Sequence, residues 1–212
     1  VVFNINYRLV PDVTVNQQLQ DVARALRWIR DHGSQYPCDM RNIMLTGDSA
    51  GGQLAAYSAV LMQSAQLRKT FDTVDPQMEL TALLLTSPVA FMRDGGLFSL
   101  YTKPMWGTDY KDKATYPYMD FDQIIDYAQA LPPTYLITSS GDTLANKQTH
   151  RLYEVLQAHE VQAEIKDYAK AEYNQSLPHV FSVLQPFEPA GTAAIDKALA
   201  FYQQAMTAKA AQ

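Results

Sequence analysis

The stretch TGDSAGGQ, residues 46–53, places one serine among three glycines and an aspartate. It follows the apolar run Ile43–Thr46, which predicts a short buried strand, and it precedes an alanine-rich segment predicted to be helical. Gly47 to Gly51 is therefore a G-x-S-x-G pattern at a strand-to-helix turn, where small residues let strand and helix pack closely. Such a turn lifts its serine above the sheet, so Ser49 is predicted to be a nucleophile. The alternative is a glycine-rich turn that only joins two elements.

The rest of the sequence alternates between strand and helix patterns, which is typical of a parallel sheet with helices on both faces. We therefore expect one α/β domain over residues 1–212. The five predicted strands are Val1–Tyr7, Ile43–Thr46, Leu80–Thr86, Thr134–Thr138 and Ala163–Tyr168, and the predicted helices are Asn16–His32, Ala50–Gln66, Lys147–His159 and Thr192–Lys209.

Residues 87–133 interrupt this alternation and are too long for a structureless loop in a compact domain. The segment is rich in aromatic residues: Phe91, Phe98, Tyr101, Trp106, Tyr110, Tyr116, Tyr118 and Phe121. We predict a helical lid, or cap, inserted over an apolar substrate pocket. The alternative is an inserted subdomain whose aromatic side chains fill a small core of its own.

A serine hydroxyl is a weak nucleophile and needs a base, which in turn needs an orienting acid. The loop NQSLPHVF follows the last predicted strand and carries His179, the predicted base. Asp142 follows the strand Thr134–Thr138 and is the predicted acid, with Glu172 as its rival. The backbone N–H of Ala50 is predicted to help bind the oxyanion.

The other three histidines are expected to have ordinary roles. His32 lies at the end of a predicted helix, before Gly33, where a cation is favourable. His150 and His159 fall within one predicted helix and are expected to face solvent or neighbouring side chains.

Composition excludes several classes of function. The net charge is −5 and the pI about 5.3, which gives no basic surface for nucleic acid.

Cys38 is the single cysteine, so we expect a buried, inert thiol with neither a disulfide framework nor a structural zinc site. No apolar run approaches the roughly 20 residues of a membrane helix. No signal peptide is visible, which leaves the compartment open with the cytoplasm as the default.

Four local motifs together resemble the hormone-sensitive-lipase-like esterases of the α/β-hydrolase superfamily. They are GDSAGG (47–52), NYRLVP (6–11), GDTL (141–144) and HVF (179–181), which are similar to the family's nucleophile elbow, Y-R-L-A-P segment, acid loop and H-G-F motif. Two positions depart from the family pattern, because Val180 replaces a glycine and Asn146 stands where many relatives carry a second acid.

The resemblance also implies an H-G-G-type loop and the first strands of the sheet upstream of the Y-R-L segment. This chain begins after that point, so we expect an α/β-hydrolase-type sheet that lacks the first strands. That arrangement would leave a sheet edge open to pairing with a second copy. It would also remove an oxyanion donor, whose loss typically costs about 10² to 10³ in turnover.

The sequence therefore predicts a serine hydrolase that cleaves short- to medium-chain acyl or aryl esters through an acyl-enzyme, without a metal or organic cofactor. Two alternatives stay open. The same three residues suit an amidase or thioesterase, and the domain could instead be a non-catalytic, hydrolase-like module for binding or assembly.

Overall fold

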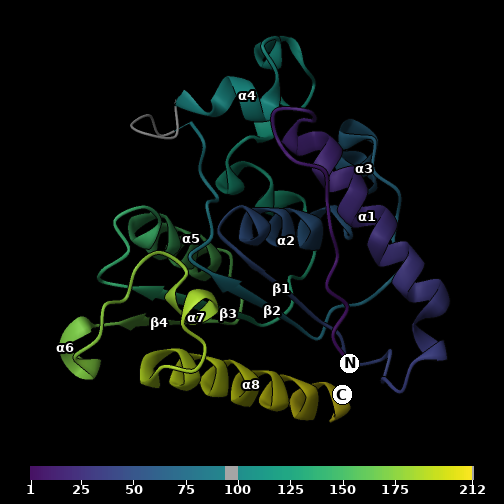
Figure 1. The fold of residues 1–212 in the computed structure, drawn as a ribbon. Helices are drawn as coiled ribbons and strands as arrows, with labels where there is room; N and C mark the ends of the chain where they lie inside the picture. Colours follow the sequence, from purple (N-terminus) through teal and green to yellow (C-terminus); the bar gives the residue numbers. More distant parts are fainter. Residues whose placement is uncertain (94–99, 212) are drawn as a thin grey trace. The chain divides into compact units, whose positions relative to one another are not determined.

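The computed structural model describes residues 1–93 and 100–211 (Figure 1). The chain divides into two compact units. The first unit comprises Val1–Arg41, Tyr57–Glu79 and Phe91–Ala130, and the second comprises Asn42–Ala56, Leu80–Ala90 and Leu131–Gln212. The two units interleave along the sequence, and helix α2 (Ser49–Leu61) begins in the second unit and ends in the first.

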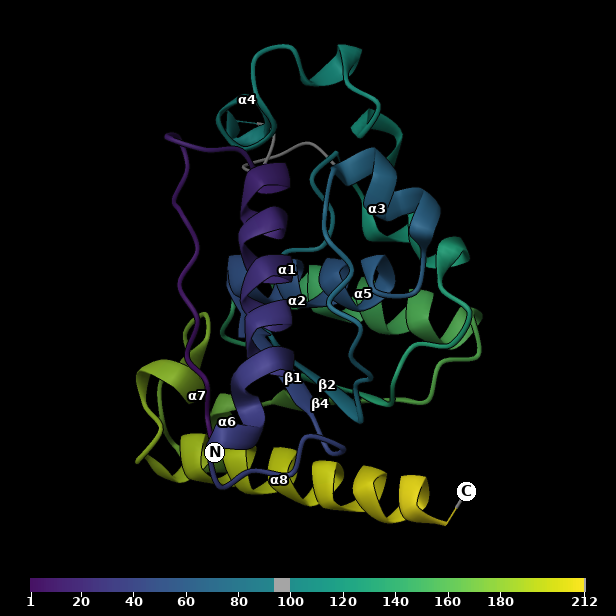
Figure 2. The same ribbon diagram turned by 90° about the vertical axis from the view of Figure 1, so that its right-hand side faces the viewer.

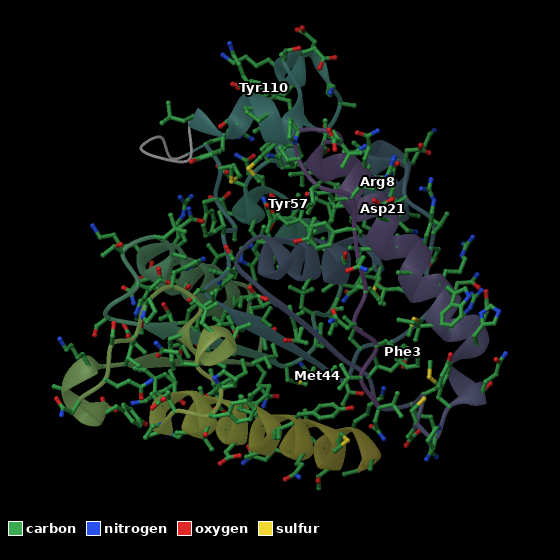
Figure 3. The ribbon with its side chains drawn as sticks, viewed as in Figure 1. Phe3, Arg8, Asp21, Met44, Tyr57 and Tyr110 are labelled. Carbon is green, nitrogen blue, oxygen red and sulfur yellow. The ribbon has the colours of Figure 1, made fainter. Side chains whose placement is uncertain are left out.

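The N-terminal segment of the first unit is extended but is not a strand, so the predicted strand Val1–Tyr7 is wrong. Its side chains alternate between exposed and half-buried, as a strand pattern requires, but no ladder pairs with it among the described residues. The segment is instead fixed by side chains: Phe3 meets Tyr36 edge-on at 5.2 Å between ring centroids. The Arg8 side chain donates two hydrogen bonds to the Asp21 carboxylate, at 2.9 and 2.8 Å, and the Arg8 backbone N–H donates a third at 3.1 Å (Figure 3).

Helix α1 (Val15–His32) confirms the predicted first helix and supplies much of the first unit's core. Its buried side chains recur at three- and four-residue steps: Val15, Leu19, Val22, Ala23, Leu26 and Ile29. The short turn η1 (Gly33–Gln35) follows. Cys38 is half-buried, with its thiol 3.2 Å from the carbonyl of Gly33, so the expectation of a buried thiol is wrong.

The predicted helix Ala50–Gln66 is two helices. It ends as α2 at Leu61, and α3 (Ala65–Phe71) begins after Ser64. The Ser64 hydroxyl accepts the N–H of Leu67 at 3.2 Å, which is an N-cap and therefore a helix start.

The aromatic segment 87–133 contains short helical pieces and is not a unit of its own, because residues 91–130 belong to the first unit. Its helical pieces are α4 (Thr102–Trp106), η3 (Tyr110–Asp112), η4 (Tyr116–Tyr118), η5 (Phe121–Gln123) and η6 (Ile125–Tyr127). Phe91, Trp106 and Phe121 are buried, and Phe121 lies 6.2 Å from the ring of Tyr57, so these aromatics fill a core. Phe98 lies outside the described residues. The role of the segment as a lid stays a prediction.

The second unit is built on a four-stranded parallel sheet in the order β1-β2-β3-β4. The strands are β1 (Met44–Asp48), β2 (Ala82–Thr86), β3 (Thr134–Ser139) and β4 (Ala163–Tyr168). The central strand β3 is buried along its whole length, as a strand covered on both faces should be, whereas the edge strand β1 is only partly buried.

Helices cover both faces of this sheet, which confirms the predicted α/β class. Helix α5 (Asn146–Ala158) packs on one face and α8 (Pro189–Ala210) on the other (Figures 1 and 2). The sheet-facing stripe of α8 consists mainly of small side chains: Ala190, Ala194, Ala198, Phe201 and Ala205. The short helices α6 (Lys170–Tyr173) and α7 (Phe181–Leu184) follow β4, and residues 174–180 connect them. In the part of the chain described here, no helix has the length and apolar character needed to cross a bilayer.

Candidate active site

The three predicted site residues all belong to the second unit and follow the carboxyl ends of its strands. Ser49 comes directly after β1, Asp142 follows the end of β3, and His179 lies in the loop between α6 and α7, beyond β4. Because these strands are parallel, their carboxyl ends share one edge of the sheet, where sites of open α/β sheets form.

The turn at Ser49 explains the glycines around it. Ser49 has a φ of +51°, which lies in the left-handed region that residues other than glycine rarely adopt. A Cβ on Gly47 would lie 2.2 Å from the carbonyl oxygen of Gly51, so strand and helix could not approach each other with a larger residue there. Backbone strain of this kind concentrates at functional sites.

The hydroxyl, the imidazole and the carboxylate form one hydrogen-bonded series. His179 Nε2 lies 2.8 Å from Ser49 Oγ, and His179 Nδ1 lies 2.9 Å from Asp142 Oδ2. An ionised carboxylate can only accept, so Nδ1 carries the proton and Nε2 is free to accept from the serine hydroxyl. The side chain of His179 is 23% exposed and that of Asp142 is 0% exposed, so solvent reaches the imidazole but not the acid.

Asp142 is held by the chain that follows it. Its Oδ1 accepts the backbone N–H groups of Leu144 and Ala145 at 3.0 and 2.9 Å. Burial acts to raise the pKa of Asp142, but the hydrogen bond from His179 and those from its other donors outweigh burial. The pKa of Asp142 therefore lies below its ordinary value, and the group is an anion at neutral pH.

The loop that carries Asp142 and the loop that carries His179 contact each other next to the site. The hydroxyl of Ser139 donates to the carbonyl of Leu177 at 2.7 Å, in a buried hydrogen bond. Gly141 packs against the same carbonyl, and a Cβ at position 141 would lie only 2.5 Å from its oxygen. Two residues after His179, Phe181 is buried against Tyr168 at the end of β4, with ring centroids 5.2 Å apart.

Residues 1–176 match the sequence model of a protein family described as the alpha/beta hydrolase fold. This chain belongs to the α/β-hydrolase family. The match confirms the resemblance inferred from the GDSAGG, GDTL and related motifs.

Individual relatives of this α/β-hydrolase chain have esterase names. It is 27% identical to the probable carboxylic ester hydrolase LipM of Mycobacterium tuberculosis over 201 residues, which are 92% of this chain and 46% of the relative. It matches the crystal structure of esterase B from Lactobacillus rhamnosis with a TM-score of 0.88 and 29% identity, covering 97% of this chain and 66% of that one. A structure of the same esterase inhibited by a C4-C4 tributyrin phosphonate matches with a TM-score of 0.87 and 30% identity, covering 98% and 68%. This chain thus spans about half the length of the curated relatives that it matches along most of its own length.

The first turn of α2 in this α/β-hydrolase contains Ala50, the predicted oxyanion donor. Ala50 is the second residue of the helix and is exposed. The N–H groups of a first helical turn have no acceptor within the helix, and they lie at the positive end of the helix dipole. The position of Ala50 is thus suited to an anion beside Ser49.

The other candidate residues of this α/β-hydrolase have partners elsewhere. Glu172, the rival acid, pairs with Lys166 at 3.2 Å. His150 Nε2 lies 2.9 Å from the Asp167 carboxylate, and His32 contacts the carbonyl of Trp28 within α1. His159 lies directly after α5 rather than within it, and its ring contacts the carbonyl of Val155. No group of three or more His, Cys, Asp or Glu side chains that could hold a metal ion occurs within residues 1–93 and 100–211.

Sequence reasoning missed two serines of this α/β-hydrolase, Ser139 and Ser87. Ser139 ties the acid loop to the histidine loop, and Ser87 is buried at the carboxyl end of β2. A local signal exists for each, because a hydroxyl at the end of a strongly apolar strand is a buried polar group in need of a partner.

Proposed function

We propose that this chain carries the reacting groups of a serine hydrolase that cleaves carboxylic esters. The single observation that supports this proposal best is the contact series from Ser49 Oγ through His179 to Asp142, at 2.8 and 2.9 Å. A domain used only for binding has no need of all three groups in one series.

In the proposed reaction, Ser49 Oγ attacks the ester carbonyl while His179 Nε2 takes its proton. Asp142 stabilises the imidazolium that forms, and the Ala50 N–H helps to hold the oxyanion. His179 then gives the proton to the leaving alcohol, which leaves an acyl group on Ser49. A water molecule, deprotonated by His179, releases the carboxylic acid and restores the serine.

For the substrate class we propose esters with short- to medium-chain acyl groups or aryl groups. The C4-C4 tributyrin phosphonate that inhibits the related esterase B supports small apolar esters. The substrate is a small molecule, and no step of the proposed reaction calls for a metal or a cofactor.

The direct test is hydrolysis of p-nitrophenyl acetate and p-nitrophenyl butyrate by the wild type and by Ser49→Ala. We expect Ser49→Ala to lose at least about a thousandfold in turnover, because the residual rate comes only from binding and oxyanion stabilisation. Ser34→Ala is the matched control, since Ser34 is an exposed serine of the first unit. Equal rates for the wild type and Ser49→Ala would reject the proposal.

Two further measurements separate the alternatives. A fluorophosphonate probe should label the wild type at Ser49 and leave Ser49→Ala unlabelled, whereas a binding-only domain would resist labelling in both forms. Parallel assays with p-nitroanilide and thioester substrates of the same acyl group decide the leaving group. Faster cleavage of either one than of the ester would assign the chain to amidases or thioesterases.

A further inference from the structure

The first residue of α5, Asn146, lies close to the loop that carries Asp142, and the proposed reaction does not use its side chain. The amide nitrogen of Asn146 donates to the backbone carbonyl of Ser139 and to Oδ2 of Asp167, each at 2.9 Å. The hydroxyl of Thr138 lies farther from this nitrogen, at 3.4 Å. A carbonyl and an ionised carboxylate can only accept, so the nitrogen of the amide, and not its oxygen, faces them.

Asn146 closes the loop of residues 140–145, in which Asp142 lies. This loop runs from Ser139, the last residue of β3, to Asn146. The Ser139 carbonyl accepts the backbone N–H of Asp142 at 3.0 Å as well as the Asn146 amide at 2.9 Å, so both of its lone pairs are used. The backbone N–H of Asn146 donates to the carbonyl of Asp142 at 3.3 Å. Asn146 therefore holds the start of the loop as well as its end.

The second acceptor of the Asn146 amide connects this loop to the neighbouring strand. Asp167 is the last residue but one of β4, and it is paired in register with Thr138 of β3. Its Oδ2 also lies 2.9 Å from His150 Nε2. Asn146 and His150 are four residues apart on α5 and so share one face of the helix. Together they fix the Asp167 carboxylate, which in turn fixes the Asn146 amide.

Ser139 extends these contacts to the histidine. Its carbonyl is held by Asn146, and its hydroxyl donates at 2.7 Å to the carbonyl of Leu177, two residues before His179. A displacement of Ser139 would therefore move the loops that carry both Asp142 and His179, whose side chains lie 2.9 Å apart. A misplacement of about 1 Å at a reacting group can cost about a hundredfold in rate.

We propose that Asn146 is a positioning residue for the reaction: its amide holds the end of β3 against Asp167 and so keeps the Asp142 carboxylate in contact with His179. This inference rests on the proposed function, because it concerns the same hydrogen-bonded series. Asn146 acts through the loop that carries Asp142 and not on the ester itself. The role requires a donor, so a carboxylate of the same shape cannot replace the amide.

The test compares Asn146→Ala and Asn146→Asp with the wild type in steady-state hydrolysis of p-nitrophenyl butyrate. Alanine removes both donated bonds, whereas aspartate keeps the shape of the side chain and places a negative charge against two acceptor oxygens. We expect kcat to fall about tenfold in Asn146→Ala and at least as far in Asn146→Asp. KM should change by less than about twofold, because no contact to the substrate is removed.

Gln157→Ala is the matched control. Gln157 lies on the same helix, and its amide also donates to a backbone carbonyl, that of Ala163, at 3.2 Å. Ala163 is the first residue of β4, at the end of the strand opposite to the site. Gln157→Ala should therefore keep a kcat within about twofold of the wild type.

A double-mutant cycle shows whether Asn146 acts through the acid. In an Asp142→Ala background, Asn146→Ala should cost less than about twofold, because the group that Asn146 positions is gone. A role in general stability would leave the cost unchanged in that background. The rate of fluorophosphonate labelling at Ser49 is the second readout where turnover is slow, and thermal unfolding sets an assay temperature at which every variant is folded.

Three outcomes overturn the inference while the proposed function stands. They are an Asn146→Ala kcat within about twofold of the wild type, a wild-type kcat in Asn146→Asp, and an unchanged loss of about tenfold in the Asp142→Ala background. Retention of full activity in Ser49→Ala is a different result, which would reject the proposed function itself.

Discussion

Asp142 is a charged group with no exposed side-chain surface, and such groups persist only where donors replace water. Its carboxylate receives the His179 ring at one oxygen and two backbone N–H groups at the other. Two of these three donors belong to the loop that carries Asp142, so folding of this loop supplies most of the hydrogen bonds that replace water at the carboxylate. The negative charge is thus ready to stabilise a positive imidazole.

Asp142 makes the free energy of unfolding depend on pH. Its pKa is lower in the folded chain than in the unfolded chain, so the unfolded chain binds the proton more tightly. Its contribution to the free energy of unfolding is therefore complete above the ordinary aspartate pKa of about 3.9, and it is lost as the pH falls below that value. Urea unfolding of the wild type and Asp142→Asn should differ clearly at about pH 6 and converge below about pH 4. A gap that stays constant down to about pH 3 would contradict this prediction.

Val180 has a φ of +52°, although it is β-branched and follows His179 directly. The left-handed region costs a residue with a Cβ about 1–2 kcal/mol. We therefore expect Val180→Gly to be more stable than Val180→Ala by about 1 kcal/mol, the reverse of the usual order of these two residues. Chemical denaturation of both variants measures this difference. The opposite order would show that the buried backbone at this position is not strained.

At the scale of elements, the site depends on two loops that meet at one carbonyl, that of Leu177. Ser139 donates to it at 2.7 Å, and Gly141 lies directly against it. Gly141→Ala would place a Cβ 2.5 Å from this backbone oxygen, which cannot rotate away as a flexible side chain would. The acid and histidine loops must then separate.

We expect Gly141→Ala to lose at least about tenfold in kcat and about 1–3 kcal/mol in stability, because the separation lengthens the contact between Asp142 and His179. Esterase assays and thermal unfolding measure the two effects. Gly51→Ala is the matched control for stability, since its Cβ would meet nothing within 4 Å. Wild-type activity in Gly141→Ala would show that the loops tolerate separation.

Local sequence patterns predicted most helices and strands well. They failed where contacts with other parts of the chain determine whether an element forms or where it ends. Strand Ala163–Tyr168 and helix α1 follow their patterns closely. Val1–Tyr7 has the alternation of a strand but lacks a ladder among the described residues, and alternation alone cannot supply one. The break between α2 and α3 depends on the Ser64 cap, which a continuous run of helix-forming residues obscures.

At the scale of the whole molecule, chain order was the information that predicted the candidate site. The order Ser49, Asp142, His179 and the position of each after a strand placed all three at one edge of a parallel sheet. Contacts between loops far apart in the sequence, such as Ser139 with Leu177, depend on strand register and loop path. Neither is encoded in a short motif, so the contact between Ser139 and Leu177 could not be predicted.

Strand β1 lies at the edge of the described sheet, and Thr46, at its centre, is exposed. Exposed edge strands pair readily with other strands, and a lysine there opposes such pairing. We predict concentration-dependent self-association of this chain through β1, which Thr46→Lys should weaken. Light scattering coupled to size exclusion, at several loading concentrations, measures it. Equal masses for both proteins at every concentration would contradict this prediction.

The site side chains and the aromatic segment belong to different units, and this has an evolutionary consequence. Ser49, Asp142 and His179 all lie in the second unit, whereas residues 91–130 lie in the first. Mutations that remodel the aromatic segment therefore change none of the groups that exchange protons. The aromatic core of the first unit can therefore diverge in sequence while selection preserves the site residues of the second unit.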